Sequence, residues 1–332
     1  MQLRLFATCP PSNKVPADQY RSQVEAIARW SEDAGCEGIL VYTDNGLVDP
    51  WLTSQLIIQS TKTLAPLVAI QPVYMHPYSV AKMISTLALY HERRLFLNMV
   101  AGGFTTDLQA LHDTTPHDER YARLIEYTQV IMGLLRAGPR PFTFAGRHYG
   151  VTNLRLAPVM PEPLVPGVFV SGSSPAGLAA ARALGATAVQ YPKPADEYSS
   201  APEGIESAGI RIGVIARDDA DEAWRVARER FPEDRRGQLT HQLAMKVSDS
   251  SWHQQLAGLG ERPVGDANPY WLLPFENYKT FCPYLVGGYD RVAAEVARYI
   301  RIGYRTFILD VPASPEEMRH IGTVFDRARA AA

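Results

Sequence analysis

Short apolar segments alternate along this chain with longer segments in which apolar residues recur every three or four positions. Segments such as Gly38–Thr43 and Gly167–Gly172 are apolar on both faces, which is typical of strands buried in a parallel sheet. The segment Asp290–Ile302 repeats valine or isoleucine at every fourth position, which predicts an amphipathic helix that covers such a sheet. Because helical crossovers allow successive strands to run parallel, the pattern predicts an α/β protein.

Eight strands are predicted outside one interruption, and they begin near residues 2, 38, 65, 94, 167, 187, 209 and 305. Eight strand–helix units favour a (β/α)8 (TIM) barrel, with a doubly wound open sheet as the alternative architecture. The interruption, Pro141–Leu156, has period-two segments and predicts a hairpin after the fourth helix. We expect a single domain over residues 1–332, in which the polar stretch 233–287 after the seventh strand forms an active-site lid.

Composition and charge narrow the possible functions. With 332 residues, 46% hydrophobic types and a formal net charge of −2, the chain can fill a large core but lacks the basic surface expected of a nucleic-acid-binding protein. It has no apolar run of about 18 residues and no secretory signal, so we expect no membrane partner. Three scattered cysteines and no paired Cys/His spacing predict a cytoplasmic, reduced protein without a metal site.

In a TIM barrel, the chemistry takes place at the C-terminal ends of the strands. This rule selects candidate residues before any motif is considered. The polar or otherwise notable residues at these ends are Cys9, Tyr42, Thr43, Asp44, Gln71, Asn98, Ala101, Ser171–Ser174, Gln190, Tyr191 and Asp310.

The sharpest local signal is the turn Ser171–Ser174, which joins an apolar strand to a helix that begins with Pro175. Ser174 is expected to cap the helix, and Gly172 would let a ligand approach the backbone. Free N–H groups and the positive end of the helix dipole predict an anion site there, most plausibly for a phosphate. The alternative is an ordinary capped turn; neither a P-loop nor a GxGxxG fingerprint is present.

Arg211 lies inside the apolar strand Gly209–Arg217. Its apolar neighbours would bury it, and a buried guanidinium requires an anionic or carbonyl partner. A structural salt bridge in the barrel wall and a role in the active site are both consistent with this pattern.

Six segments, taken in order, resemble the bacterial-luciferase-like flavin-dependent monooxygenases, specifically the alkanesulfonate monooxygenase branch. The combination of a strand with NMVAG, then ERY, a hairpin with FAGRHY and a strand with SGSS is more specific than any one of these motifs. The segments cover most of the chain and are Gly35–Trp51, Leu87–Gly103, His117–Leu135, Phe142–Val151, Val168–Ala181 and Gly209–Trp224.

The resemblance implies a barrel that uses reduced FMN (FMNH2) supplied by a separate NAD(P)H:flavin reductase. It implies that O2 is activated as a flavin C4a-(hydro)peroxide, and that the protein is a homodimer or homotetramer. Residue by residue, it assigns the FMN phosphate to Tyr121, Ser171, Gly172, Ser173 and Ser174, and the isoalloxazine ring to Asp44, Asn98 and Ala101. Arg211 matches a strand-7 arginine of the alkanesulfonate enzymes, and Lys279 lies near an arginine that closes over their substrate.

Several positions depart from the alkanesulfonate pattern. Gly213 and Cys9 stand where those enzymes carry histidines, and Leu309–Ser314 lacks their Tyr and His. Ala101 stands where close relatives often carry Thr, so one hydrogen bond to the ring would be absent. We therefore expect flavin chemistry to be kept and desulfonation to be lost, with Arg211, Cys9 and Lys279 as the catalytic candidates.

The sequence thus predicts a two-component FMNH2-dependent monooxygenase that oxygenates a small organic substrate, by hydroxylation or N-oxygenation rather than desulfonation. One alternative keeps the fold but uses the deazaflavin F420 as a hydride carrier. A second is a non-catalytic flavin-binding subunit, because several of the family's polar residues are missing.

Overall fold

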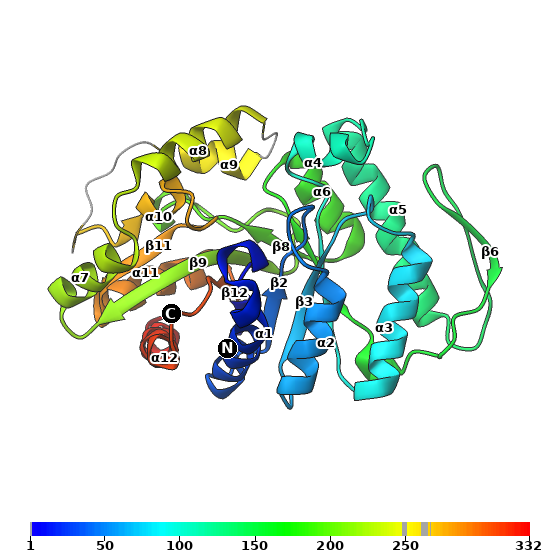
Figure 1. Ribbon diagram of the computed structural model, residues 1–332, viewed down its shortest axis with the longest axis horizontal. Coiled ribbons are helices and arrows are strands. Elements are labelled where there is room, and N and C mark those ends of the chain that lie inside the picture. Colours follow the sequence, from blue (N-terminus) through cyan, green and yellow to red (C-terminus); the bar gives the residue numbers. More distant parts are fainter. Residues whose placement is uncertain (1, 248–250, 260–264, 266) are drawn as a thin grey trace.

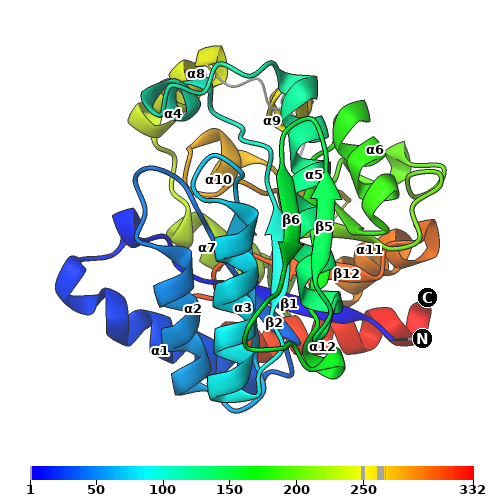
Figure 2. The same ribbon diagram turned by 90° about the vertical axis from the view of Figure 1, so that its right-hand side faces the viewer.

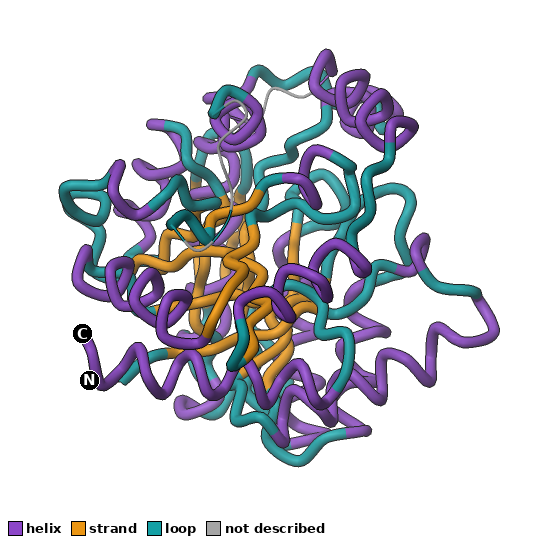
Figure 3. Tube along the Cα trace, turned by 90° about the vertical axis from the view of Figure 1, so that its left-hand side faces the viewer, coloured by secondary structure: helices purple, strands orange, loops and turns teal. Residues whose placement is uncertain are grey.

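The computed structural model describes residues 2–247, 251–259, 265 and 267–332. Eight parallel strands form a closed ring surrounded by helices, with the strands gathered at the centre (Figures 1 and 3). In ring order the strands are β1 (Arg4–Thr8), β2 (Gly38–Val41), β3 (Ala65–Ile70), β4 (Phe96–Met99), β7 (Gly167–Ser171), β8 (Thr187–Gln190), β9 (Ala208–Arg217) and β12 (Thr306–Leu309), which pairs with β1 again. The predicted (β/α)8 barrel is therefore confirmed, and the open sheet is excluded because β8 pairs with β9 and β12 with β1.

Most residues of the strands are buried because helices cover the outside of the barrel and side chains fill its interior. The helix predicted over Asp290–Ile302 is confirmed within one residue. The helices that cover the outside of the barrel are α1 (Ala17–Asp33), α2 (Pro50–Ser60), α3 (Pro77–His91), α5 (His117–Arg136), α6 (Pro175–Leu184), α7 (Ala220–Arg230), α11 (Tyr289–Ile302) and α12 (Pro315–Ala331). A short helix that the sequence did not predict, α4 (Thr105–Ala110), follows β4.

The floor of the barrel is closed by aromatic packing. Phe6, Phe96 and Phe169 make edge-to-face contacts with ring centroids 5.2–5.7 Å apart. The guanidinium of Arg4 lies 5.0–5.4 Å from all three ring centroids and is paired with Glu37. The interior is therefore open only at the C-terminal ends of the strands.

The predicted hairpin is confirmed as β5 (Phe142–Ala145) and β6 (Gly150–Leu154), which lie against the outside of α5 (Figure 2). The carboxylate of Glu126 on α5 accepts hydrogen bonds from the backbone N–H groups of residues 147, 148 and 149 at the hairpin. This hairpin therefore lies outside the barrel and does not change the order of the barrel strands.

The insertion 233–287 contains more regular structure than the sequence predicts. Its helices are α8 (Arg235–Val247), α9 (Ser251–Ala257) and α10 (Leu273–Glu276); α8 and α9 lie above the open end of the barrel, beside α4 (Figure 1). Its end forms β11 (Tyr284–Gly288), which pairs in parallel with the second half of β9, and antiparallel with β10 (Tyr270–Trp271). Neither β10 nor β11 is predicted from the sequence. Residues 248–250, 260–264 and 266 of the insertion lie outside the described residues.

Candidate active site

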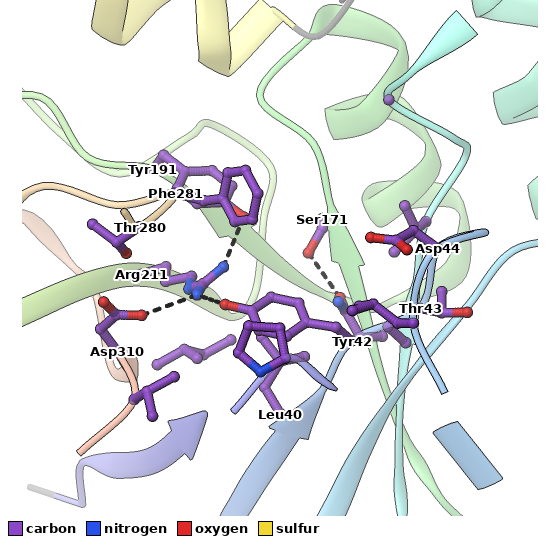
Figure 4. A pocket seen from close by; sticks show the side chains of 18 of the residues that line it. Leu40, Tyr42, Thr43, Asp44, Ser171, Tyr191, Arg211, Thr280, Phe281 and Asp310 are labelled. Atoms are coloured by element: carbon purple, nitrogen blue, oxygen red, sulfur yellow. Dashed lines mark hydrogen bonds and ion pairs between the residues drawn. The ribbon is translucent and has the colours of Figure 1, made fainter. Parts of the chain in front are cut away.

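A cavity of about 910 Å³ occupies the open end of the barrel (Figure 4). It is lined by strand ends and by residues of the insertion 233–287, as the TIM-barrel rule predicts. Ten of the predicted site residues line it, namely Asp44, Asn98, Ala101, Tyr121, Ser171, Gly172, Ser173, Ser174, Arg211 and Lys279. The structure thus gathers residues from distant parts of the sequence around one space.

The turn between β7 and α6 has the conformation expected of an anion site. The hydroxyl of Ser174 caps α6 by accepting a hydrogen bond from the N–H of Gly177 at 3.1 Å, and Pro175 occupies the first turn. A Cβ atom on Gly172 would lie 2.5 Å from the hydroxyl oxygen of Tyr121, so only glycine allows this tyrosine to approach the turn. The Ser173 hydroxyl is buried and has no hydrogen-bond partner among the described residues.

An unsatisfied buried hydroxyl is costly unless a ligand supplies its partner. The Ser173 hydroxyl, the start of α6 and the Tyr121 side chain together fit a phosphate group, such as that of FMN. His117, which was not among the predicted site residues, also lines the cavity, and its ring contacts Tyr121 at a centroid distance of 5.2 Å. Its position on the first turn of α5, one helical turn before Tyr121, was the available sequence signal.

The three predicted ring-binding residues lie at the C-terminal ends of β2 and β4, which β3 separates in the ring. Asn98 on β4 is buried, and its side-chain oxygen accepts a hydrogen bond of 2.8 Å from the Ser171 hydroxyl on the neighbouring β7. Asp44 follows β2 and accepts a hydrogen bond from the backbone N–H of Gly46. Ala101 is buried and presents only a methyl group. Asn98 links the anion turn to the centre of the cavity.

Arg211 is 2% exposed, and its guanidinium contacts three side chains on the opposite side of the cavity (Figure 4). It donates to the hydroxyl groups of Tyr42 and Tyr191, and lies 3.3 Å from a carboxylate oxygen of Asp310. The predicted anionic partner is therefore Asp310, at the end of β12. Since Arg211 already occupies this carboxylate, Asp310 serves as the counter-ion of the guanidinium.

The Tyr284 ring occupies the space beside Gly213. A Cβ atom on Gly213 would lie 2.3 Å from the Tyr284 ring, so this ring fills the space that a side chain at position 213 would take. The Tyr284 hydroxyl donates a hydrogen bond of 2.7 Å to Asp310. Burial and the adjacent Asp310 raise the pKa of Tyr284 well above its usual value, so the phenol stays protonated and keeps donating. Tyr284 was not predicted as a site residue, because β11, on which it lies, was not predicted.

Lys279 lines the mouth of the cavity and forms an ion pair of 2.6 Å with Asp234. Its side chain is 43% exposed, so a substrate anion could compete for the ammonium group. Tyr278 and Phe281 of the same segment also face the cavity, whereas Trp271 packs against Trp224 of α7 and Phe275 packs against His241 of α8. The aromatic residues of this segment are thus divided between the cavity lining and the packing of the insertion against its neighbours.

Cys9 is the one predicted catalytic residue that the structure does not place in the cavity lining. It is 1% exposed and belongs to the hydrophobic cluster beneath α1. Burial raises the pKa of its thiol to about 12, so a thiolate is not populated at neutral pH. The structure therefore supports a packing role and gives no support to catalysis by Cys9.

The insertion also contacts the far side of the barrel mouth. His253 on α9 is fully buried, lines the cavity and lies 6.2 Å from the Phe104 ring that precedes α4. Burial and the nearby His241 lower the pKa of His253 to about 4, so the imidazole is neutral at physiological pH. His253 thus forms part of the uncharged wall with which the insertion covers the cavity.

Two further sequence predictions concern metals and membranes. Among the described residues, no group of His, Cys, Asp and Glu side chains could hold a metal ion. None of the helices in the described part of the chain is both long enough and apolar enough to cross a membrane.

Comparison with known proteins defines the class. Residues 1–306 match the luciferase-like monooxygenase family. The chain is similar to 4-(gamma-L-glutamylamino)butanoyl-[BtrI acyl-carrier protein] monooxygenase BtrO from Niallia circulans, with 34% identity over 314 residues, covering 92% of this chain and 91% of that protein. The chain therefore belongs to the luciferase-like monooxygenase family, and the predicted enzyme class is confirmed.

Solved structures share the fold at low sequence identity. EDTA monooxygenase from Chelativorans sp. BNC1 has a TM-score of 0.74 and 13% identity, with 100% of this chain and 95% of that chain covered. An F420-dependent secondary alcohol dehydrogenase has a TM-score of 0.65 and 17% identity, with 99% and 100% covered. The same barrel thus occurs both in a monooxygenase and in an F420-dependent dehydrogenase.

Proposed function

We propose that this protein is the oxygenase component of a two-component system that uses FMNH2 and O2. The observation that carries the proposal is the anion turn, where Gly172, Tyr121 and the unpartnered Ser173 hydroxyl fit the FMN phosphate. The isoalloxazine ring would extend from this turn past Asn98 towards the barrel centre. When bound, the reduced flavin supplies the electrons that activate O2.

The protein's own residues position the reactants and exclude water. Arg211 is held by Tyr42, Tyr191 and Asp310, so its positive charge is fixed at the cavity wall and can stabilise negative charge that develops during the reaction. Tyr278, Phe281 and His253 cover the mouth with uncharged surface. A separate NAD(P)H:flavin reductase would supply FMNH2.

We infer that the substrate is an acyl group attached to a carrier protein. This inference rests on the relative, whose name describes an acyl-carrier-protein-bound substrate and whose sequence matches almost the whole chain. Hydroxylation or N-oxygenation is favoured over desulfonation because the position of the missing histidine, Gly213, is closed by the Tyr284 ring.

Flavin titration tests the cofactor. FMN should bind, and Ser173→Ala and Tyr121→Phe should each weaken binding about tenfold, equivalent to about 1.4 kcal/mol. Ser12→Ala, at a hydroxyl remote from the turn, is the control. Binding that is unaffected by both variants would remove the phosphate from this turn.

The competing candidate is an F420-dependent oxidoreductase, which the structural likeness to such an enzyme favours. Tight binding of F420 together with substrate turnover that needs no O2 would replace the proposed function with this one. Substrate-dependent O2 consumption with FMNH2 supports the monooxygenase.

We also propose a homo-oligomer. α2 and α3 lie side by side on the barrel surface (Figure 2), and Leu52, Leu89 and Tyr90 on them are 60–70% exposed. Exposed large apolar side chains are favoured where subunits meet. Light scattering after size-exclusion chromatography should give at least twice the monomer mass, and Leu52→Glu with Leu89→Glu should lower it.

A further inference from the structure

The cavity does not end at the barrel mouth. It continues along α1, where Gln23, Ala26, Ile27 and Trp30 line it. These positions are spaced i, i+3, i+4 and i+7, so they form one continuous stripe on one face of the helix. The stripe is about 10 Å long at 1.5 Å per residue. The other walls of this space, the α1 channel, are Pro10, Pro11, Val15 and the segment Val311–Ala313.

The α1 channel lies opposite the anion turn. In the ring of eight strands, β1 and β7 are separated by β2, β3 and β4, which is half of the circumference. A flavin phosphate on the β7–α6 turn leaves this channel free. The channel is therefore available to a second ligand, and because Arg211 lines the same cavity, such a ligand would extend towards the centre of the barrel.

The lining of the channel describes that occupant. Its inner walls are apolar, while the amide side chain of the exposed residue Gln23 adds hydrogen-bonding groups at the rim. Asn13 and Lys14 line the cavity but are exposed, so they mark the rim. Lys14 forms no ion pair with any residue that the structure describes, which leaves its ammonium group available to an anion.

We propose that the α1 channel binds the phosphopantetheine tether of the carrier protein that delivers the substrate. This inference rests on the proposed function. The tether is an extended chain with two amides and a phosphate at its outer end, which matches apolar walls, amide side chains and a cationic rim. The phosphate would bind Lys14 at the surface, and the thioester would place the acyl group near Arg211.

The first test is binding of 4′-phosphopantetheine, measured by calorimetry with FMN present. Ala26→Leu fills the channel and should weaken binding at least tenfold; Lys14→Glu should do the same. The matched controls are Ser22→Leu, on an exposed turn of α1, and Lys62→Glu, at an exposed lysine remote from the cavity; both should bind like the parent. Pantetheine, which lacks the phosphate, should be insensitive to Lys14→Glu.

The second test separates the sources of the tether. The phosphopantetheinylated (holo) form of BtrI, the carrier protein of the relative, should bind at least tenfold more tightly than its apo form and than coenzyme A. Coenzyme A binding as tightly as the holo protein would overturn the carrier-protein assignment. Equal effects of Ala26→Leu and Ser22→Leu, or displacement of 4′-phosphopantetheine by FMN, would overturn the channel.

Flavin binding distinguishes failure of this inference from failure of the proposed function. Ala26→Leu and Lys14→Glu should leave FMN affinity and substrate-free H2O2 release unchanged, because neither residue lies near the β7–α6 turn. If FMN binds and O2 is reduced while 4′-phosphopantetheine does not bind, only the channel assignment fails.

Discussion

The position and orientation of each side chain in this site depend on its neighbours as much as on its own chemistry. Gly213 illustrates this, because the space beside it is filled by the Tyr284 ring from a strand about 70 residues later in the chain. Tyr284 then donates to Asp310, which in turn holds Arg211. A change at position 213 therefore affects the orientation of the buried guanidinium as well as local packing.

Gly213→Ala should lower the free energy of unfolding by about 1–3 kcal/mol, because its Cβ atom would overlap the Tyr284 ring. In a Tyr284→Ala background the same substitution should cost much less, since the overlap is gone. Chemical denaturation of both single variants and the double variant measures this coupling. Additive effects would show that the ring does not occupy the space beside position 213.

At the scale of elements, the N-terminal ends of the strands stabilise the barrel while their C-terminal ends carry the site. Glu32 near the end of α1 accepts hydrogen bonds from the N–H groups of Lys62, Thr63 and Leu64, which form the turn between α2 and β3. Partial burial opposes its ionisation, but these donors and the Thr63 hydroxyl outweigh that effect and hold the pKa of Glu32 at about 2.

Glu32→Gln should therefore lower the free energy of unfolding by about 1–2 kcal/mol at neutral pH. This is less than the pKa shift alone would give, because solvent screens a partly exposed carboxylate. A pKa below the unfolded value of 4.5 means that the stabilisation is present above pH 4.5 and is lost as the pH falls towards 2. The difference between the two proteins in denaturation should shrink over this range. Asp33→Asn, at the exposed neighbouring residue, is the control; a difference that does not vary with pH would contradict the carboxylate's role.

Elements differed in how well the sequence predicted them. The eight barrel strands are short and apolar on both faces, so their pattern was sufficient. β10 and β11 lie within a stretch rich in Pro, Gly and polar residues, and β11 becomes a strand because the second half of β9 leaves the barrel and offers it an unpaired edge. Such pairing depends on tertiary contacts that local periodicity does not contain.

For the whole molecule, the insertion 233–287 converts an open barrel into a covered cavity. Within the insertion, Lys279 forms an ion pair with Asp234, which lies at its start. His253 of the insertion contacts Phe104 on the other side of the cavity mouth. We propose that this cover limits the access of water to the flavin and that substrate entry requires it to move.

Breaking the Lys279–Asp234 pair tests this proposal. With FMNH2 supplied by a reductase and no substrate, Lys279→Met and Asp234→Asn should each raise H2O2 release about twofold or more, because either change removes the ion pair that positions the insertion over the cavity. The fold itself should stay stable, since an exposed ion pair contributes little to the free energy of unfolding. If Lys279 also binds the substrate, only Lys279→Met should raise KM in turnover assays. Arg225→Met, which breaks an exposed pair on α7, is the control, and an equal effect there would refute the specific role.

The sequence by itself determined the barrel, the Ser174 cap of α6 and the burial of Arg211, because each follows from local patterns: apolar strands, a serine before a helix that begins with proline, and a lone cation among apolar residues. Only the tertiary structure decided that Asp310 is the partner of Arg211, that Tyr284 replaces a side chain at position 213, and that Cys9 packs beneath α1. It also revealed the α1 channel. These features depend on which distant segments come into contact when the barrel closes. Local sequence patterns do not specify those contacts.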